Sequence, residues 1–166
     1  DTFWDIALVQ YLETSVINSP YFNLYLASQI HDADDALFTC GYKVNDLITV
    51  IGDVHHIFPK KYLIKNGVNE KSKYNQIANY TYLDTQVNKA VRDDSPNIYF
   101  SKVFEQCETG IAVYGNITDK ALLLKNLQQN CIPETILQME HTNYEEFLAE
   151  RRKLMAKKIK KYYYSL

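Results

Sequence analysis

At 166 residues, the chain is long enough for one domain with its own core and hardly for two. Its hydrophobic content of 46% and charged content of 23% are those of an ordinary globular protein. No apolar run approaches the roughly 18 residues that span a bilayer, which excludes a membrane-spanning helix. There is no signal-peptide pattern, and we expect a cytoplasmic protein with no membrane partner.

Three cysteines, odd in number and far apart, form no Cys-x-x-Cys pair. This argues against a disulfide scaffold and against a structural zinc knuckle, and it favours a reducing compartment. The first residue is Asp1 rather than Met, which suggests a fragment from which a preceding domain is missing.

The net charge of -2 divides unevenly along the chain. Residues 151–161 carry seven positive charges and no acid, whereas the remainder holds 11 basic and 20 acidic residues and sums to -9. This asymmetry is compatible with a nucleic-acid footprint at the C-terminal end, and equally with the solvated face of a helix.

Helical spacing of apolar residues predicts helices over 3–16 and 20–38, the second starting at Ser19-Pro20 with Ser as the cap. The acidic cluster Asp32, Asp34 and Asp35 is expected on the solvent-facing side of the second helix. The segment 44–51 fits either a short helix or the approach to a strand.

A ββα pattern follows. Residues 54–58 predict a strand ended by Pro59, and 60–65 a helical turn broken at Asn66-Gly67. Residues 79–83 predict a second strand, because Tyr and Thr alternate there. Asp84 or Thr85 is expected to cap a helix with Asn88 in its first turn, closed at 94–96. Further helices are expected at about 98–108, 119–129 and 144–164.

The predicted fold class is therefore α+β, with a small ββα core embedded in a mostly helical domain. We expect one domain over 1–166: a helical lead-in at 1–50, the core at 51–95, and a helical C-terminal region at 96–166 that includes the basic helix.

Chemistry points to the adjacent His55 and His56 and to Asn79 and Asn88, nine residues apart. Imidazole titrates near working pH, so His56 is a candidate general base. Neighbouring residues on a strand point to opposite sides, which leaves His55 and the amide of Asn88 as candidate metal ligands. So few protein ligands suit Mg²⁺ first, with Mn²⁺ or a later transition metal as alternatives, and not a closed zinc site.

The run Gly52-Asp53-Val54-His55-His56-Ile57-Phe58-Pro59, followed by Asn79 and Asn88, resembles the HNH (His-Me finger, ββα-metal) endonuclease motif. The resemblance implies a one-metal site in which His56 activates water, Asn79 supports the loop that orients it, and His55 and Asn88 bind the metal. Products would carry 5′-phosphate and 3′-hydroxyl ends.

Over about residues 40–164 the chain is similar to the C-terminal nuclease region of GmrSD-type, type IV modification-dependent restriction proteins. The stretches 52–63, 76–80 and 147–156 carry this similarity. It implies a DNA endonuclease of restriction and phage defence. Relatives usually also carry an N-terminal ParB-like NTP-hydrolysing domain, which is an expected partner absent from this sequence.

Candidate phosphate contacts flank the motif and occupy the C-terminal basic segment: Lys60, Lys61, Lys89, Arg92, Arg151, Arg152, Lys157 and Lys158. Asp53 is either a support for His55 or a turn residue. Asn75 falls before the second predicted strand and is the weaker candidate for a site role, while His31 and His141 are expected to be structural or exposed. Tyr80 and Tyr82 are expected to pack rather than to stack on bases.

Two other functions fit the same residues. One is a catalytically silent or partner-dependent DNA-binding or docking module of a larger restriction protein, although such a module has no reason to retain all four motif residues. The other is an RNase, because nothing in the sequence reads a 2′-hydroxyl.

Overall fold

The computed structural model describes residues 1–50 and 54–166, and it is mostly helical with one small two-stranded sheet. The elements, in chain order, are η1 (Phe3–Ala7), α1 (Leu8–Tyr11), α2 (Pro20–His31), α3 (Val44–Val50), β1 (His55–His56), α4 (Lys60–Lys65), α5 (Lys71–Tyr74), η2 (Ile77–Asn79), β2 (Tyr80–Thr81), α6 (Thr85–Val91), α7 (Pro96–Thr109), α8 (Lys120–Gln129), η3 (Glu134–Gln138), η4 (His141–Asn143) and α9 (Tyr144–Tyr163).

Helix starts follow the predicted capping residues. The Ser19 hydroxyl accepts a hydrogen bond from the Phe22 amide at 3.1 Å, with Pro20 in the first helical position of α2. The Asp84 carboxylate accepts one from the Gln86 amide at 2.9 Å, so the helix that carries Asn88 begins where the sequence predicts. These short polar side chains satisfy amide groups that have no partner within the helix.

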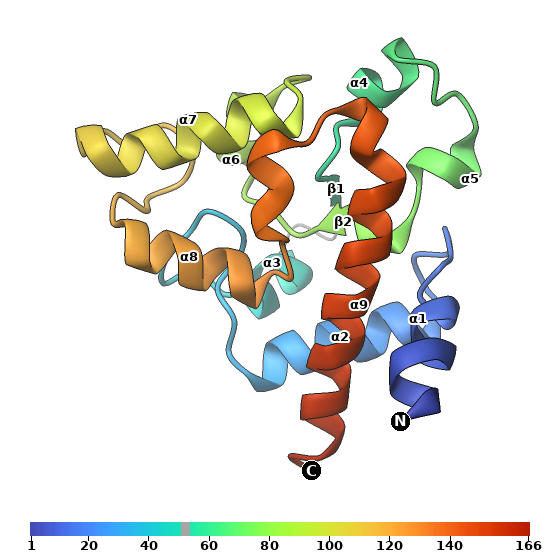
Figure 1. The fold of residues 1–166 in the computed structure, drawn as a ribbon. Helices are drawn as coiled ribbons and strands as arrows, with labels where there is room; N and C mark the ends of the chain where they lie inside the picture. The colour runs from blue at the N-terminus through green and yellow to red at the C-terminus, as the bar shows by residue number, and fades with distance from the viewer. Residues whose placement is uncertain (51–53) are drawn as a thin grey trace.

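Strands β1 and β2 pair antiparallel in the middle of the molecule (Figure 1), with His55 opposite Thr81 and His56 opposite Tyr80. Each strand is only two residues long, shorter than predicted. On the first strand, Pro59 ends the pairing because it cannot donate to a ladder, and α4 starts at the next residue. The coarse prediction of a mixed, mostly helical fold is confirmed.

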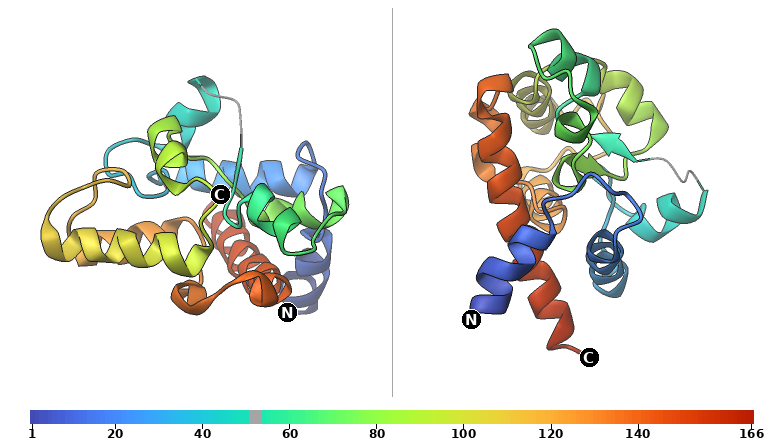
Figure 2. Two further views of the ribbon diagram at one scale, coloured as in Figure 1. Left: turned by 90° about the horizontal axis from the view of Figure 1, so that it is seen from above. Right: turned by 90° about the vertical axis from the view of Figure 1, so that its right-hand side faces the viewer.

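Helix α9 crosses the molecule from the neighbourhood of α4 to the C-terminus, packing against α2, α1, η1 and η2 on the way (Figure 1). Viewed from above, α7 and α8 lie on one side of it, and α4, α5 and the N-terminal helices on the other (Figure 2). Its buried residues recur every three or four positions, as on one face of a helix: Tyr144, Phe147, Leu148, Arg151, Arg152, Met155, Ala156 and Ile159.

The two N-terminal helices are shorter than predicted. The first consists of the π-helical η1 and the short α1, and it stops at Tyr11 rather than at residue 16. Helix α2 stops at His31, because the loop that follows is held by a side chain of α8 instead. Oδ1 of Asn126 accepts a hydrogen bond from the Phe38 backbone amide, and its Nδ2 donates one to the Ala36 carbonyl. Among the described residues, no helix is long and apolar enough to cross a membrane.

Candidate functional site

The predicted catalytic residues meet at the two-stranded sheet. His55 and His56 are both half-buried on β1, and their side chains leave opposite faces of the strand. Helix α6 begins at Thr85, four residues after the end of β2. Of the described motif residues, His55 and His56 lie on β1, Asn79 is the last residue of η2 directly before β2, and Asn88 lies in α6.

Asn79 fixes the backbone that follows His56. Its side chain is fully buried, its Oδ1 accepts from the Phe58 amide at 2.8 Å, and its Nδ2 donates to the Phe58 carbonyl at 3.1 Å and the Tyr74 carbonyl at 3.3 Å. Its own carbonyl accepts from the Ile57 amide at 2.8 Å. Leaving these buried groups without partners would cost about 1–3 kcal/mol each, so Asn79 holds the chain just past His56 in one conformation.

His56 lies in polar contact with Asn75, which the sequence marks only as a weak candidate. Its Nε2 is 2.9 Å from Oδ1 of Asn75, and its ring packs edge-on against Tyr80 at 5.3 Å between centroids. With the Asn75 carbonyl oxygen as acceptor, Nε2 carries the proton and the lone pair is on Nδ1.

Burial favours the neutral form of this imidazole. Burial lowers the pKa of His56 below its ordinary value; the hydrogen bond to Asn75 opposes the shift and the charge of Lys60 adds to it. A neutral imidazole at neutral pH is the form that can accept a proton from water, so the surroundings of His56 suit a general base.

Asn75 lies at the end of α5, and the chain returns from there to β2. Its place ahead of the second strand made it a weak candidate in the sequence. One signal in the sequence could have marked Asn75: it lies only four residues before Asn79. The Asn79 side chain hydrogen-bonds to Phe58, just after His56, so the chain must return to β1 at this point. Asn75 is therefore brought close to His56.

The candidate metal ligands sit on separate elements. His55 is on β1 opposite Thr81, and Asn88 is half-buried in the middle of α6, beside Val87 and Val91, which enter the core. Across residues 1–50 and 54–166 there is no group of three or more His, Cys, Asp or Glu side chains placed to hold a metal. Asp53 lies outside the described residues. A cation here would therefore rely on one imidazole, one amide oxygen and water, a donor set that fits Mn²⁺ and later divalent metals at least as well as Mg²⁺.

Arg151 lies inside the protein, whereas the sequence predicts it on a DNA-facing surface. Its side chain is 1% exposed, its Nη1 donates to the carbonyls of Ala78 at 2.9 Å and Tyr80 at 2.6 Å, and its Nη2 donates to that of Asn130 at 3.2 Å. The first two carbonyls lie on either side of Asn79. Arg151 is thus an internal brace from α9 to β2, and no phosphate can reach its guanidinium.

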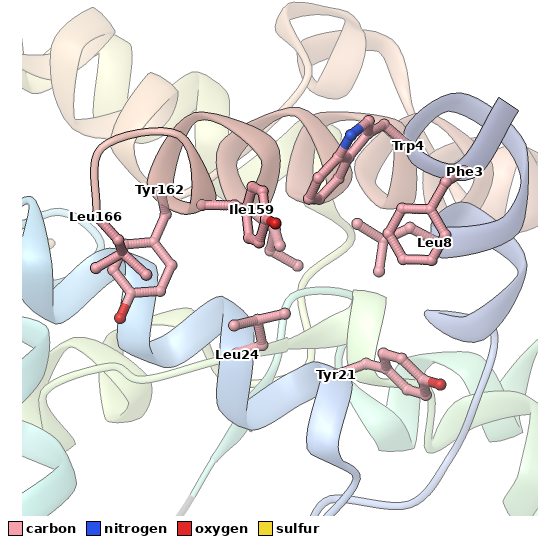
Figure 3. A pocket seen from close by; sticks show the side chains of 9 residues that line it. Phe3, Trp4, Leu8, Tyr21, Leu24, Ile159, Tyr162 and Leu166 are labelled. Atoms are coloured by element: carbon pink, nitrogen blue, oxygen red, sulfur yellow. The ribbon is translucent and has the colours of Figure 1, made fainter. Parts of the chain in front are cut away.

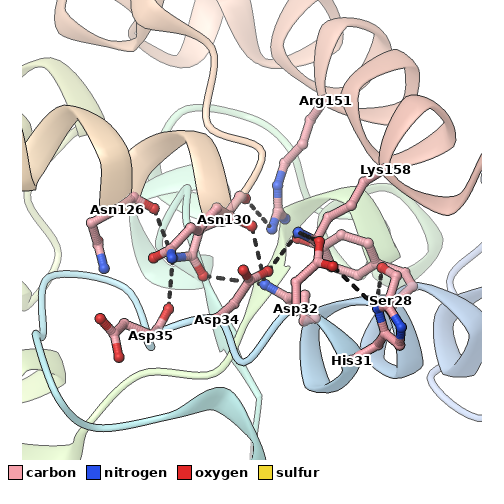
Figure 4. A network of polar contacts seen from close by, with 12 residues as sticks. Ser28, His31, Asp32, Asp34, Asp35, Asn126, Asn130, Arg151 and Lys158 are labelled. Atoms are coloured by element: carbon pink, nitrogen blue, oxygen red, sulfur yellow. Dashed lines mark hydrogen bonds and ion pairs between the residues drawn. The ribbon is translucent and has the colours of Figure 1, made fainter. Parts of the chain in front are cut away.

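Arg152 and Lys158 are also largely withdrawn from solvent, whereas the sequence predicts exposed phosphate contacts at both positions. Arg152 is 8% exposed, and the ammonium of Lys158 lies 2.6 Å from Asp34 and 3.1 Å from Asp32 (Figure 4). Burial alone would lower the pKa of Lys158, but the hydrogen bond and charge of Asp34 raise it overall. The expected solvent-facing acidic cluster is likewise wrong for Asp34, which is 3% exposed and faces α9.

The remaining predicted phosphate contacts are on the surface. Lys60, Lys61, Lys89, Arg92 and Lys157 are all exposed. Their contact with nucleic acid stays a prediction. Tyr80 is 5% exposed and packs against His56, which confirms the packing role expected of it.

An apolar cavity of about 400 Å³ lies near the two chain ends, between η1, α2 and α9 (Figure 3). Its lining includes no carboxylate, histidine or lysine among the described residues: Phe3, Trp4, Leu8, Tyr21, Leu24, Ile159, Tyr162, Tyr163 and Leu166. None of the residues around His56 belongs to it. The candidate chemistry is therefore at the sheet rather than in this cavity.

No family model matches the chain, and neither a curated protein nor a solved structure is detectably similar to it. The HNH resemblance accordingly rests on the motif residues themselves and on the elements that carry them.

Proposed function

We propose that this protein is a metal-dependent endonuclease of the HNH, ββα-metal type, which hydrolyses phosphodiester bonds of DNA in restriction of foreign or modified DNA. The observation that carries the proposal is the setting of His56. A neutral imidazole on a short strand is oriented by Asn75, and the strand's continuation is pinned by the buried Asn79.

In the proposed reaction, His56 accepts a proton from water at Nδ1 while its Nε2–H remains hydrogen-bonded to Asn75. The water oxygen forms a bond to phosphorus while the bond from phosphorus to the 3′ oxygen breaks. The released 3′ oxygen takes up a proton from solvent, which gives 5′-phosphate and 3′-hydroxyl ends. His55 and Asn88 would hold a divalent cation, which when bound supplies positive charge to the phosphate and to the leaving oxygen.

The proposed roles of the two histidines, metal ligand and general base, follow from their positions on β1. Because His55 and His56 leave β1 on opposite faces, one imidazole serves as a ligand while the other remains free of the metal to take a proton. A site with two histidines on one helix face would place both on the same metal instead.

The test is nicking of supercoiled plasmid, modified and unmodified, in Mg²⁺, Mn²⁺ or EDTA, by the wild type and His56→Ala. We expect cutting that requires the metal and is lost in the variant. His31→Ala is the matched control, because His31 is exposed at the end of α2 and paired with Asp32. Metal-dependent cutting that survives His56→Ala would refute the assignment, and cutting of RNA in preference to DNA would refute the substrate.

A further inference from the structure

The segment between the two strands is a strongly basic stretch of exposed surface next to His56. Residues 60–73 hold five lysines and one glutamate, a net charge of +4, and all five lysines are exposed. The segment folds as α4 and α5, which pack against each other (Figure 1). The one acid, Glu70, pairs with Lys73 at 3.0 Å and leaves the other four ammonium groups without a carboxylate of their own segment.

This surface is continuous with the candidate site at both of its ends. Lys60 follows His56 by four residues and lies over the Tyr74 ring at 5.2 Å, and that ring is 6.4 Å from the His56 imidazole between centroids. At the other end, α5 leads directly into Asn75, which contacts His56. A polyanion bound along α4 and α5 would therefore run past the imidazole.

Hydrogen bonds from the elements behind this segment hold it in place. The Tyr62 hydroxyl accepts from the His141 amide at 2.7 Å, and the Tyr144 hydroxyl donates to the Lys73 carbonyl at 2.7 Å. These contacts fix α4 and α5 on η4 and α9, so that the lysines are presented outward from a rigid support.

The surface lacks a platform for single-stranded nucleic acid. Unpaired bases are bound mainly by stacking on exposed aromatic rings, and both aromatic residues of α4 and α5 are engaged: Tyr74 is 4% exposed and Tyr62 is half-buried against His141. Lysines without exposed aromatics suit the regular phosphate backbone of a duplex.

We propose that α4 and α5 form the docking surface for the phosphate backbone of duplex DNA, through Lys60, Lys61, Lys65 and Lys71. The inference rests on the proposed nuclease function and adds to it where the substrate lies. It places the duplex on the segment that follows His56, where Lys60 and Lys61 are already candidate phosphate contacts, rather than on the C-terminal basic helix.

The alternative surface on α9 provides a matched control. Lys153, Lys157 and Lys161 are exposed and four residues apart, so they form one ridge. That ridge follows α9 toward the C-terminus and away from β1 (Figure 1). It offers three exposed lysines to neutralise, as many as are changed on the test surface.

The experiment measures binding of a short fluorescent DNA duplex to the otherwise intact chain carrying His56→Ala, over a series of salt concentrations. One variant adds Lys61→Gln, Lys65→Gln and Lys71→Gln, and the other adds Lys153→Gln, Lys157→Gln and Lys161→Gln. The first should reduce the slope of log affinity against log salt by about 3 and weaken binding roughly tenfold. The second should change neither.

Equal losses in both variants, or a loss in the α9 variant alone, would overturn the proposed surface, as would the absence of duplex binding by the parent. Duplex RNA competing as well as duplex DNA would overturn the commitment to DNA. The same substitutions in the protein with His56 intact separate the two proposals. Plasmid cutting unaffected by the α4–α5 substitutions means that only the surface is wrong, whereas no metal-dependent cutting by the wild type means that the nuclease function is wrong.

Discussion

Two basic segments of this chain differ in how their charged side chains are placed. Residues 60–73 present all five of their lysines to solvent, whereas in 151–161 the first two basic residues are buried and Lys158 is paired with two aspartates. The first segment lies beside His56, and the second supports the backbone of β2 from inside. The comparison teaches that charge density along a sequence does not by itself locate a nucleic-acid surface.

Helical periodicity separates the two cases. In α9 the apolar residues Phe147 and Leu148 are followed, one and two turns later, by the arginine pair and by Met155 and Ala156. The arginines thus occupy positions of the buried stripe, while Lys153 and Lys157 fall on the opposite face. The helical period of the apolar residues therefore distinguishes cations that point inward from those that point outward.

The largest effect is expected from Arg151→Met, which removes the buried guanidinium and keeps the length and apolar stem of the side chain. It leaves the carbonyls of Ala78, Tyr80 and Asn130 without their donor, so we expect a loss of about 4 kcal/mol in the free energy of unfolding. Urea denaturation measures it, with Lys153→Met as the exposed control. Equal stability of the two variants would mean that Arg151 is no brace.

A smaller loss is expected from Lys158→Met. The change leaves Asp34 buried opposite no cation, at a cost of about 3 kcal/mol at neutral pH. Burial already raises the pKa of Asp34, and without Lys158 it will rise further. The folded variant then favours protonated Asp34, so its deficit should shrink as pH falls through that raised pKa. Denaturation at several pH values tests this, and a deficit that grows in acid would contradict it.

The third change tests whether Asn75, at the end of α5, acts on His56 through its hydrogen bond. Asn75→Leu keeps the burial of His56 and removes its acceptor, so the pKa of His56 should fall further below its ordinary value. The cleavage rate should drop roughly tenfold, and its acidic limb should move to lower pH. NMR titration of His56 follows the shift independently of activity, and an unchanged pKa would remove Asn75 from the site.

Much of the local structure around the candidate site could be predicted from the sequence, because its determinants lie within single elements. The positions of His55 and His56 before Pro59, the cap at Asp84 and the alternation after Asn79 each report on their own element. What escaped prediction depends on pairing across long separations: Asn75 with His56 over 19 residues, Arg151 with Tyr80 over 71, and Lys158 with Asp32 over 126. The spacing of residues within one element carries no information about such long-range contacts.

The end of α2 illustrates the same limit. Apolar spacing continues past His31 and predicts a helix to residue 38, but Asn126 on α8 supplies the hydrogen bonds that hold the loop instead. Tertiary contacts override the local preference there.

The central claim is that His56 is the general base of a phosphodiesterase site. It is tested most directly by single-turnover cleavage of duplex DNA, with saturating metal, by the wild type and His56→Ala, each with and without added imidazole. We expect the variant to be slower by about 10²–10⁴-fold, and imidazole to restore part of its rate while leaving the wild type unchanged. His56→Ala cutting at the wild-type rate would contradict the account.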